Sequence, residues 1–134
     1  MKDSSEKLQQ LYFQLLENEF DYPIYDVVPE TKQYPYYTLD SFLGREDNTK
    51  DEYGMEVEAQ VSAWSLGGGK KQTNTMGNDL IEFLRDRSAP INFGDTYNIY
   101  VTTVSLVETI EQETDNGMLY RRIVRFNHKI QQLT

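Results

Sequence analysis

The strongest secondary-structure signal in the chain is the ten-residue run Met55-Glu56-Val57-Glu58-Ala59-Gln60-Val61-Ser62-Ala63-Trp64. Small or apolar side chains alternate in it with mostly polar ones, a period of two that is typical of a strand with one buried face. Trp64 stands on the polar side near the end of the run, so it either covers a sheet edge or contacts a partner. The run predicts a half-buried β-strand in the middle of the chain.

An amphipathic helix is predicted on each side of this strand. The first covers about residues 4–18, where apolar side chains share one helical face: Leu8, Leu11, Tyr12, Leu15 and Leu16. The second covers about residues 72–87, after the break at Gly67-Gly68-Gly69, with Thr73 or Asn74 as its cap. Its apolar face consists of Met76, Leu80, Ile81 and Leu84.

Five further strands complete the predicted fold. Two precede the central run, at Ile24–Val28 and Tyr36–Phe42, and three follow it, at Ile91–Phe93, Thr96–Glu113 and Met118–Ile130. Thr114-Asp115-Asn116-Gly117 joins the last two, and its Asn-Gly pair suits the positive φ angles of a type I′ turn. The order α-β-β-β-α-β-β-β predicts an α+β fold with two helices packed on one face of a mainly antiparallel sheet. We expect a single domain over residues 1–134.

The segment Gly44–Gly54 has a different composition from its surroundings. Four of its eleven residues are acidic, and Tyr53 is its one large apolar side chain. Such a segment buries too little surface to offset the entropy lost on ordering it, so we expect a long mobile loop. Loops of this length in small domains are often functional, which makes this one a candidate contact arm.

Composition and charge narrow the class of protein. The chain has 134 residues, 38% of them hydrophobic and 26% charged, with no stretch of the roughly 18 apolar residues that a membrane span needs. Its formal charge of −9 opposes binding to phosphate. The one dense basic stretch, Arg121–Arg125, is divided between two faces if it is a strand, with Arg122 opposite the other arginines. We therefore expect a protein made in the cytoplasm, with no membrane contact and no specific nucleic-acid binding.

Catalytic and metal motifs fail on their details. Gly67-Gly68-Gly69-Lys70-Lys71 lacks both the earlier glycine and the Ser or Thr that a phosphate-binding loop requires after its Gly-Lys pair. An EF-hand loop counted from Asp47 has Glu52 where glycine is needed. The chain has no cysteine and one histidine, His128, which we expect to be a structural residue on a strand's apolar face. The sequence predicts no enzyme, no cofactor and no metal.

Tyrosine is the residue type that stands out. Ten are present, and five lie within sixteen residues: Tyr22, Tyr25, Tyr34, Tyr36 and Tyr37. A tyrosine ring combines a large contact area with a polar group, which suits interfaces, but the same residues also fill the cores of sheet-rich domains. Both interpretations stay open at this level.

Taken in order, these segments resemble the tail completion, or head–tail joining, proteins of long-tailed phages. The resemblance covers nearly the whole chain and rests on short elements that follow the first helix: Ile24-Tyr25-Asp26-Val27-Val28-Pro29, Tyr34-Pro35-Tyr36-Tyr37-Thr38-Leu39, Val61-Ser62-Ala63-Trp64-Ser65 and Tyr120-Arg121-Arg122-Ile123-Val124-Arg125-Phe126. It implies a tail terminator that caps the head-proximal end of the tail tube and joins the tail to the connector of the DNA-filled capsid.

The resemblance also implies partners and a location. The partners are the tail tube protein, the head connector or stopper protein, and further copies of the chain in a hexameric ring through which DNA passes. The location is the head-proximal end of the tail in the virion. We predict that the partner contacts lie in three regions, at Arg45, Glu46, Asp47, Asp51, Glu52 and Tyr53, at Trp64, Lys70 and Lys71, and at Asp115 and Asn116.

Two alternatives remain open. In the first alternative, the chain is a neighbouring head–tail connector adaptor. Such a protein is expected to have a basic lumen, which the charge of −9 disfavours. In the second, the chain is an acidic host-directed binding protein that occupies a basic site on a nuclease or polymerase.

Overall fold

The computed structural model describes residues 5–46, 54–86, 92–93 and 97–132. Within these ranges the elements follow the predicted order. The helices are α1, Ser5–Glu19, and α2, Lys70–Ile81, which continues into the π-helical turn η1, Glu82–Asp86. The strands are β1, Ile24–Tyr25, β2, Tyr36–Glu46, β3, Gly54–Leu66, β4, Asn92–Phe93, β5, Tyr97–Thr114, and β6, Gly117–Gln132. The predicted α+β class is confirmed.

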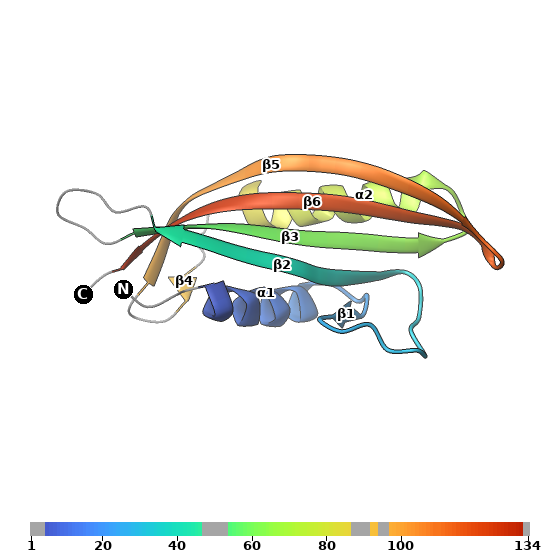
Figure 1. Ribbon diagram of the computed structural model, residues 1–134, viewed down its shortest axis with the longest axis horizontal. Helices are drawn as coiled ribbons and strands as arrows, with labels where there is room; N and C mark the ends of the chain where they lie inside the picture. Colours follow the sequence, from blue (N-terminus) through green and yellow to red (C-terminus); the bar gives the residue numbers. More distant parts are fainter. Residues whose placement is uncertain (1–4, 47–53, 87–91, 94–96, 133–134) are drawn as a thin grey trace.

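The strands form one long, curved sheet in the order β1-β2-β3-β6-β5-β4 (Figure 1). β1 runs parallel to β2, and the other neighbouring pairs are antiparallel. β3 and β6 pair from Gly54↔Gln131 at one end to Leu66↔Leu119 at the other. Because β3 has a neighbour on both sides, Trp64 lies on the face of an inner strand, and the prediction that it covers a sheet edge is wrong.

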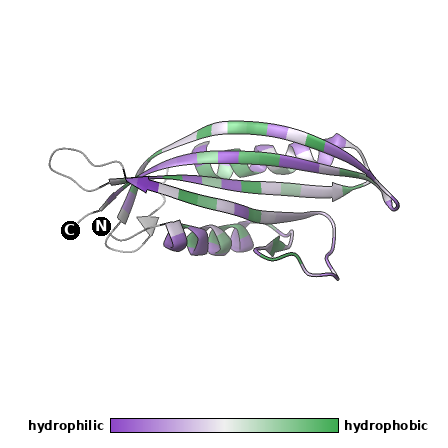
Figure 2. Ribbon diagram, in the orientation of Figure 1, coloured by the Kyte–Doolittle hydropathy of each residue, from purple (hydrophilic) through white to green (hydrophobic). Residues whose placement is uncertain are grey.

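Both helices pack on the same face of the sheet. Tyr12 of α1 makes edge contacts with Phe126 of β6, and Gly77 of α2 lies against Val124 of the same strand. Even-numbered residues of β6 therefore point to the helices, as the period of two requires. Figure 2 shows hydrophobic and hydrophilic residues alternating along the strands. The core between helices and sheet includes Leu8, Leu16, Met76, Leu80, Val57, Ala59, Val61 and Ile130.

Several boundaries differ from the predictions because pairing overrides local composition. β1 ends at Tyr25, since its backbone pairs with Tyr37 and Thr38 alone. β2 continues through Glu46, because Gly44, Arg45 and Glu46 pair with residues 55–57 of β3. The predicted Gly44–Gly54 loop was thus drawn too wide: its first three residues and Gly54 belong to strands, and residues 47–53 lie outside the described residues.

Glycines explain the other two differences. Gly67, Gly68 and Gly69 have φ values of 70°, 73° and 82°, so they turn the chain from β3 into α2 at once. The helix then begins at Lys70, and Thr73 lies inside it and not at its cap. In the β5–β6 turn, Gly117 has φ 123° while Asp115 and Asn116 keep negative φ, so the hairpin is confirmed but its turn is not type I′.

Candidate assembly surfaces

The face of the sheet opposite the helices, called here the helix-free face, carries a polar network centred on Asp40. β2 has a bulge between Leu39 and Ser41, so Asp40 is the extra residue without a partner on β3. The alternation from Thr38 places the Asp40 carboxylate on the helix-free face, where its side chain is 14% exposed, and the bulge then turns Phe42 to the helix side. A polar group at this depth is stable only when its hydrogen bonds are satisfied.

Four side chains donate to that carboxylate. Oδ1 accepts from Thr38 Oγ1 at 2.7 Å, and Oδ2 accepts from Gln60 Nε2 at 3.0 Å. Oδ2 also accepts from Arg121 Nη2 at 3.0 Å and from the hydroxyl of Ser62. The network therefore ties together the three strands β2, β3 and β6.

Trp64 is fixed next to this network. Its Nε1 donates to Thr38 Oγ1 at 2.8 Å, its ring stacks on Tyr36 with centroids 6.0 Å apart, and the Arg121 guanidinium lies 4.8 Å from the ring centroid. Tyr36 also contacts the rings of Tyr25 and Tyr34. One half-exposed aromatic cluster therefore forms at this end of the helix-free face, and Trp64 is a rigid part of it.

The clustered tyrosines divide between core and surface. Tyr37 is wholly buried on the helix side, where its hydroxyl donates to the Met76 carbonyl at 2.9 Å. Tyr36 is buried within the aromatic cluster, whereas Tyr25 and Tyr34 are half-buried. Burial raises the pKa of Tyr36 and Tyr37 above the ordinary value, so both hydroxyls stay protonated.

Arg45 marks the other end of the sheet. Its Nη2 donates to Glu56 Oε1 at 2.9 Å, and Asn127 Nδ2 donates to the same oxygen at 2.9 Å. Arg45 is 71% exposed, so this ion pair contributes little to stability. Glu46 is exposed beside it. The remaining predicted residues of this region, Asp47, Asp51, Glu52 and Tyr53, lie outside the described residues.

The α2 start and the β5–β6 hairpin meet at the opposite end (Figure 1). The Gly67 amide donates to the Met118 carbonyl at 2.8 Å, and Lys70 Nζ pairs with Glu111 Oε1 at 2.7 Å. Lys71 and both hairpin-tip residues, Asp115 and Asn116, are exposed. The structure thus brings the second and third predicted contact regions together.

The described residues of the predicted contact regions therefore form two groups at opposite ends of the sheet. β3 runs the whole way between them, from Gly54 to Leu66. Thirteen strand residues span about 40 Å at the usual rise per residue. The two groups are therefore too far apart for any one side chain to belong to both.

His128 is a structural residue, as predicted. It is wholly buried, and both ring nitrogens have a hydrogen-bond partner. Nε2 contacts the Tyr12 hydroxyl, and Nδ1 lies 2.9 Å from Thr102 Oγ1. Burial lowers the pKa of His128 to about 4, so the ring is neutral near pH 7. Among the described residues, no group of three or more acidic or histidine side chains is placed to hold a metal ion.

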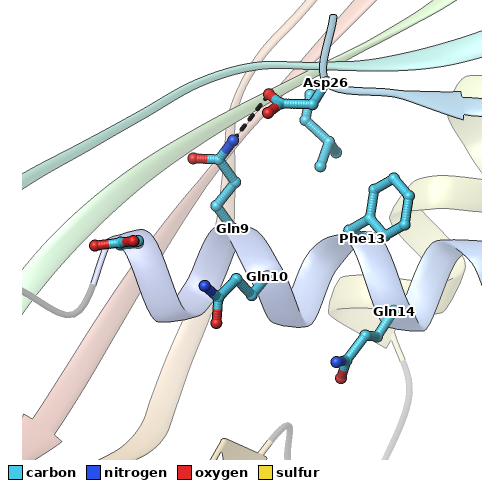
Figure 3. A pocket seen from close by; sticks show the side chains of 7 residues that line it. Gln9, Gln10, Phe13, Gln14 and Asp26 are labelled. Carbon is cyan, nitrogen blue, oxygen red and sulfur yellow. Dashed lines mark hydrogen bonds between the residues drawn. The ribbon is translucent and has the colours of Figure 1, made fainter.

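A hollow of about 580 Å³ lies between α1, β1 and β2 (Figure 3). Gln9 Nε2 donates to Asp26 Oδ1 at 2.9 Å across it, and Phe13 is 37% exposed at its side. The described residues that line it include no nucleophile beside a base: Glu6, Gln9, Gln10, Phe13, Gln14, Asp26 and Leu39.

Sequence reasoning missed Asp40 and most of its donors. The predicted division of the arginines between two faces is confirmed. Arg121 and Arg125 lie on the helix-free face, where Arg125 Nη2 donates to Gln60 Oε1 at 2.7 Å. Arg122 points to the helix side. The polar residues that β2, β3 and β6 carry on the helix-free face were the sequence signal that could have indicated this network. On β2 the bulge at Asp40 reverses the alternation of the residues that follow, so the pattern could not be recognised there.

Comparison with known proteins identifies the family. Tail completion protein gp17 matches over residues 15–131. A chain from the virion of a native gene transfer agent particle has the same fold, with a TM-score of 0.79 and 13% identity over 98% of this chain and 99% of that chain. No curated protein is significantly similar in sequence. None of the helices in the described ranges is long and apolar enough to cross a membrane. Because the match covers most of its length, the chain belongs to the family of tail completion protein gp17, phage structural and assembly proteins of the virion tail.

Proposed function

We propose that this protein caps the head-proximal end of the tail tube and joins the tail to the connector of the DNA-filled capsid. The observation that carries the proposal is the division of its candidate contact regions between the two ends of one rigid sheet. A joining protein must hold two partners at once, and this arrangement keeps their binding sites about 40 Å apart on a single strand, β3.

The rigidity of the sheet supports this role. The Asp40 network and the Trp64 cluster connect β2, β3 and β6 by side-chain contacts in addition to the backbone ladder. A domain stiffened in this way transmits the position of one partner to the other without bending. The protein then acts by binding and geometry, and not by catalysis.

In the assembled state the protein forms a ring, which we propose to be a hexamer. The chain carries a charge of −9, and β5 contributes Glu108, Glu111 and Glu113 with no Lys or Arg. An acidic ring repels phosphate, so DNA passes through it without specific binding. The tail tube protein and the connector or stopper protein are the two partners along the axis.

The test is joining in vitro. Purified protein is added to tails and DNA-filled capsids that were produced without it, and infectious particles are counted against a sample without protein. A rise in titre supports the joining role. No rise, from folded protein and with both substrates competent, contradicts it and favours a connector adaptor or a host-directed binding protein.

A further inference from the structure

Among the described residues, the two long edges of the sheet have no neighbouring strand over most of their length. On its outer side β5 pairs with β4 at Asn98 and Tyr97 alone, so from Ile99 to Thr114 it has no outer partner strand among the described residues. On the opposite edge, β1 covers Tyr37 and Thr38 of β2. Beyond Thr38, no other described strand lies outside β2.

Such edges are normally protected in a monomer. An open strand presents unpaired N–H and C=O groups, and proteins protect it with charged side chains (lysine above all), proline, bulges or a short length. β5 has 18 residues and contains neither lysine nor proline. It has two bulges, at Tyr100 and Ser105, and three glutamates in its second half. Its length and its uncharged first half are nevertheless those of a strand that can pair with another chain.

Exposed apolar side chains gather at these same two edges. Of the large hydrophobic residues exposed in the described part of the chain, Phe13 alone lies on a helix. The others lie on β5, at Tyr100, Val101, Val107 and Ile110, on β2, at Leu43, or in the connection that follows β1, at Val27 and Val28. Apolar residues at two different edges fit a head-to-tail contact, in which one edge of a subunit meets the other edge of its neighbour.

Strand direction permits this contact. β2, β3, β6 and β5 alternate in direction across the sheet, since each neighbouring pair is antiparallel. β5 of one copy and β2 of the next therefore run in opposite directions when the sheets are placed side by side in the same orientation. The four long strands then repeat without a break in the antiparallel pattern.

We propose that the β5 edge of one copy pairs with the β2 edge of the next, so that a continuous antiparallel sheet closes the ring. The occupant of the open β5 edge is thus a second copy of this chain. This inference rests on the proposed function, because it specifies how the ring of that assembly is held together. It also assigns Leu43 and Val101 to the contact between subunits.

Disulfide mapping tests the proposal without background, because the chain has no cysteine. Leu43→Cys on β2 is combined in turn with one cysteine on β5, at Val101, Thr103, Glu108 or Ile110, and each variant is oxidised after addition to tails that lack the protein. Within one copy the two cysteines are separated by β3 and β6, about 14 Å, which is too far for a disulfide. A ladder of linked chains from at least one combination is the expected result.

Two outcomes overturn the inference. One is the absence of a ladder from all four combinations. The other is efficient dimer formation by Val101→Cys alone, which shows β5 pairing with β5. Titre in the joining assay is read separately, so a chain that joins tails without a ladder refutes the edge contact and leaves the proposed function standing.

A lysine substitution provides the matched control. Val101→Lys places a charge on the β5 edge and is expected to abolish the ladder of the Leu43→Cys, Thr103→Cys variant if that combination cross-links. Phe13→Lys makes the same change at a residue of equal exposure, 37%, on α1 and is expected to leave the ladder intact. Equal ladders from both lysine variants contradict the proposal.

Discussion

Asp40→Ala is expected to lower the free energy of unfolding far more than the removal of an exposed surface carboxylate would. The substitution removes a carboxylate that accepts from Thr38, Gln60, Ser62 and Arg121. A hydrogen bond to a charged group contributes about 1.5–3 kcal/mol, but these four are not additive and water replaces part of the loss at Arg121, whose side chain is 28% exposed. We expect a loss of about 3 kcal/mol, which lowers the Tm of a domain of this size by about 10 °C.

The assay is urea unfolding followed by far-UV circular dichroism, with the free energy of unfolding taken at constant m-value. Asp40→Asn keeps one oxygen for the donors at Oδ2 and loses the charge, so its expected cost is about half as large, roughly 1.5 kcal/mol. Combining Asp40→Ala with Arg121→Ala should cost less than the sum of the two single substitutions, because the pair shares one interaction.

Glu58→Ala is the matched control. Glu58 is a carboxylate on the same face, 37% exposed and 3.5 Å from Arg125, and its removal should cost under about 0.5 kcal/mol. If Asp40→Ala is no more destabilising than Glu58→Ala, the network does not stabilise the sheet and the reasoning fails.

Three further predictions concern the core and the turn. Burial lowers the pKa of His128 to about 4 in the folded chain, whereas its pKa in the unfolded chain is near 6.5. Between these pH values the unfolded chain binds more protons, so the free energy of unfolding falls by about 3 kcal/mol from pH 7 to pH 4. His128→Gln should lose this part of the pH dependence, and unchanged slopes in urea unfolding at several pH values refute the assignment. Gly77→Ala places a Cβ 2.9 Å from Arg122 Cγ. The overpacking costs about 1–3 kcal/mol, which exceeds the gain of about 1 kcal/mol from the higher helix propensity of alanine. Calorimetry should therefore give a lower Tm, and a higher Tm contradicts this packing. Gly117→Ala meets no atom within 4 Å but must adopt φ 123°, so a loss of about 1–2 kcal/mol is expected in thermal unfolding, and a neutral result means that the turn rearranges.

Much of the fold was predictable because the sheet has one face against the helices. The alternation from Met55 to Ala63 in β3 and the split of Arg121 from Arg122 in β6 both follow from that asymmetry, and both are confirmed. His128 was placed correctly for the same reason. A period of two survives wherever one face is buried and the strand is regular.

The rest depended on contacts between distant residues. Strict alternation along β2 places Asp40 and Phe42 on one face, but the bulge separates them, and Phe42 packs against Tyr12 with ring centroids 5.1 Å apart. The polar end of β2, Gly44 to Glu46, has little strand propensity and is held by its pairing with β3. Neither the bulge nor this pairing is written in local composition, so the course of β2 beyond Asp40 could not be predicted.

Edge chemistry was only partly visible in the sequence. The uncharged first half of β5 and the three glutamates of its second half can be read directly from the chain. That β5 lies near one edge and β2 near the other is a property of the strand order, which local patterns do not specify.

The central claim is that this protein sits on the end of the tail that meets the capsid. A single cysteine introduced at Glu17, an exposed residue of α1 outside the predicted contact regions, allows one gold particle to be attached to each chain, because no other cysteine is present. Tails produced without the protein are mixed with the labelled chain and imaged by electron microscopy before capsids are added. Label at the head-proximal end of the tails is the predicted result. Label absent from tails but bound to isolated DNA-filled capsids would contradict the claim and identify a connector adaptor in its place.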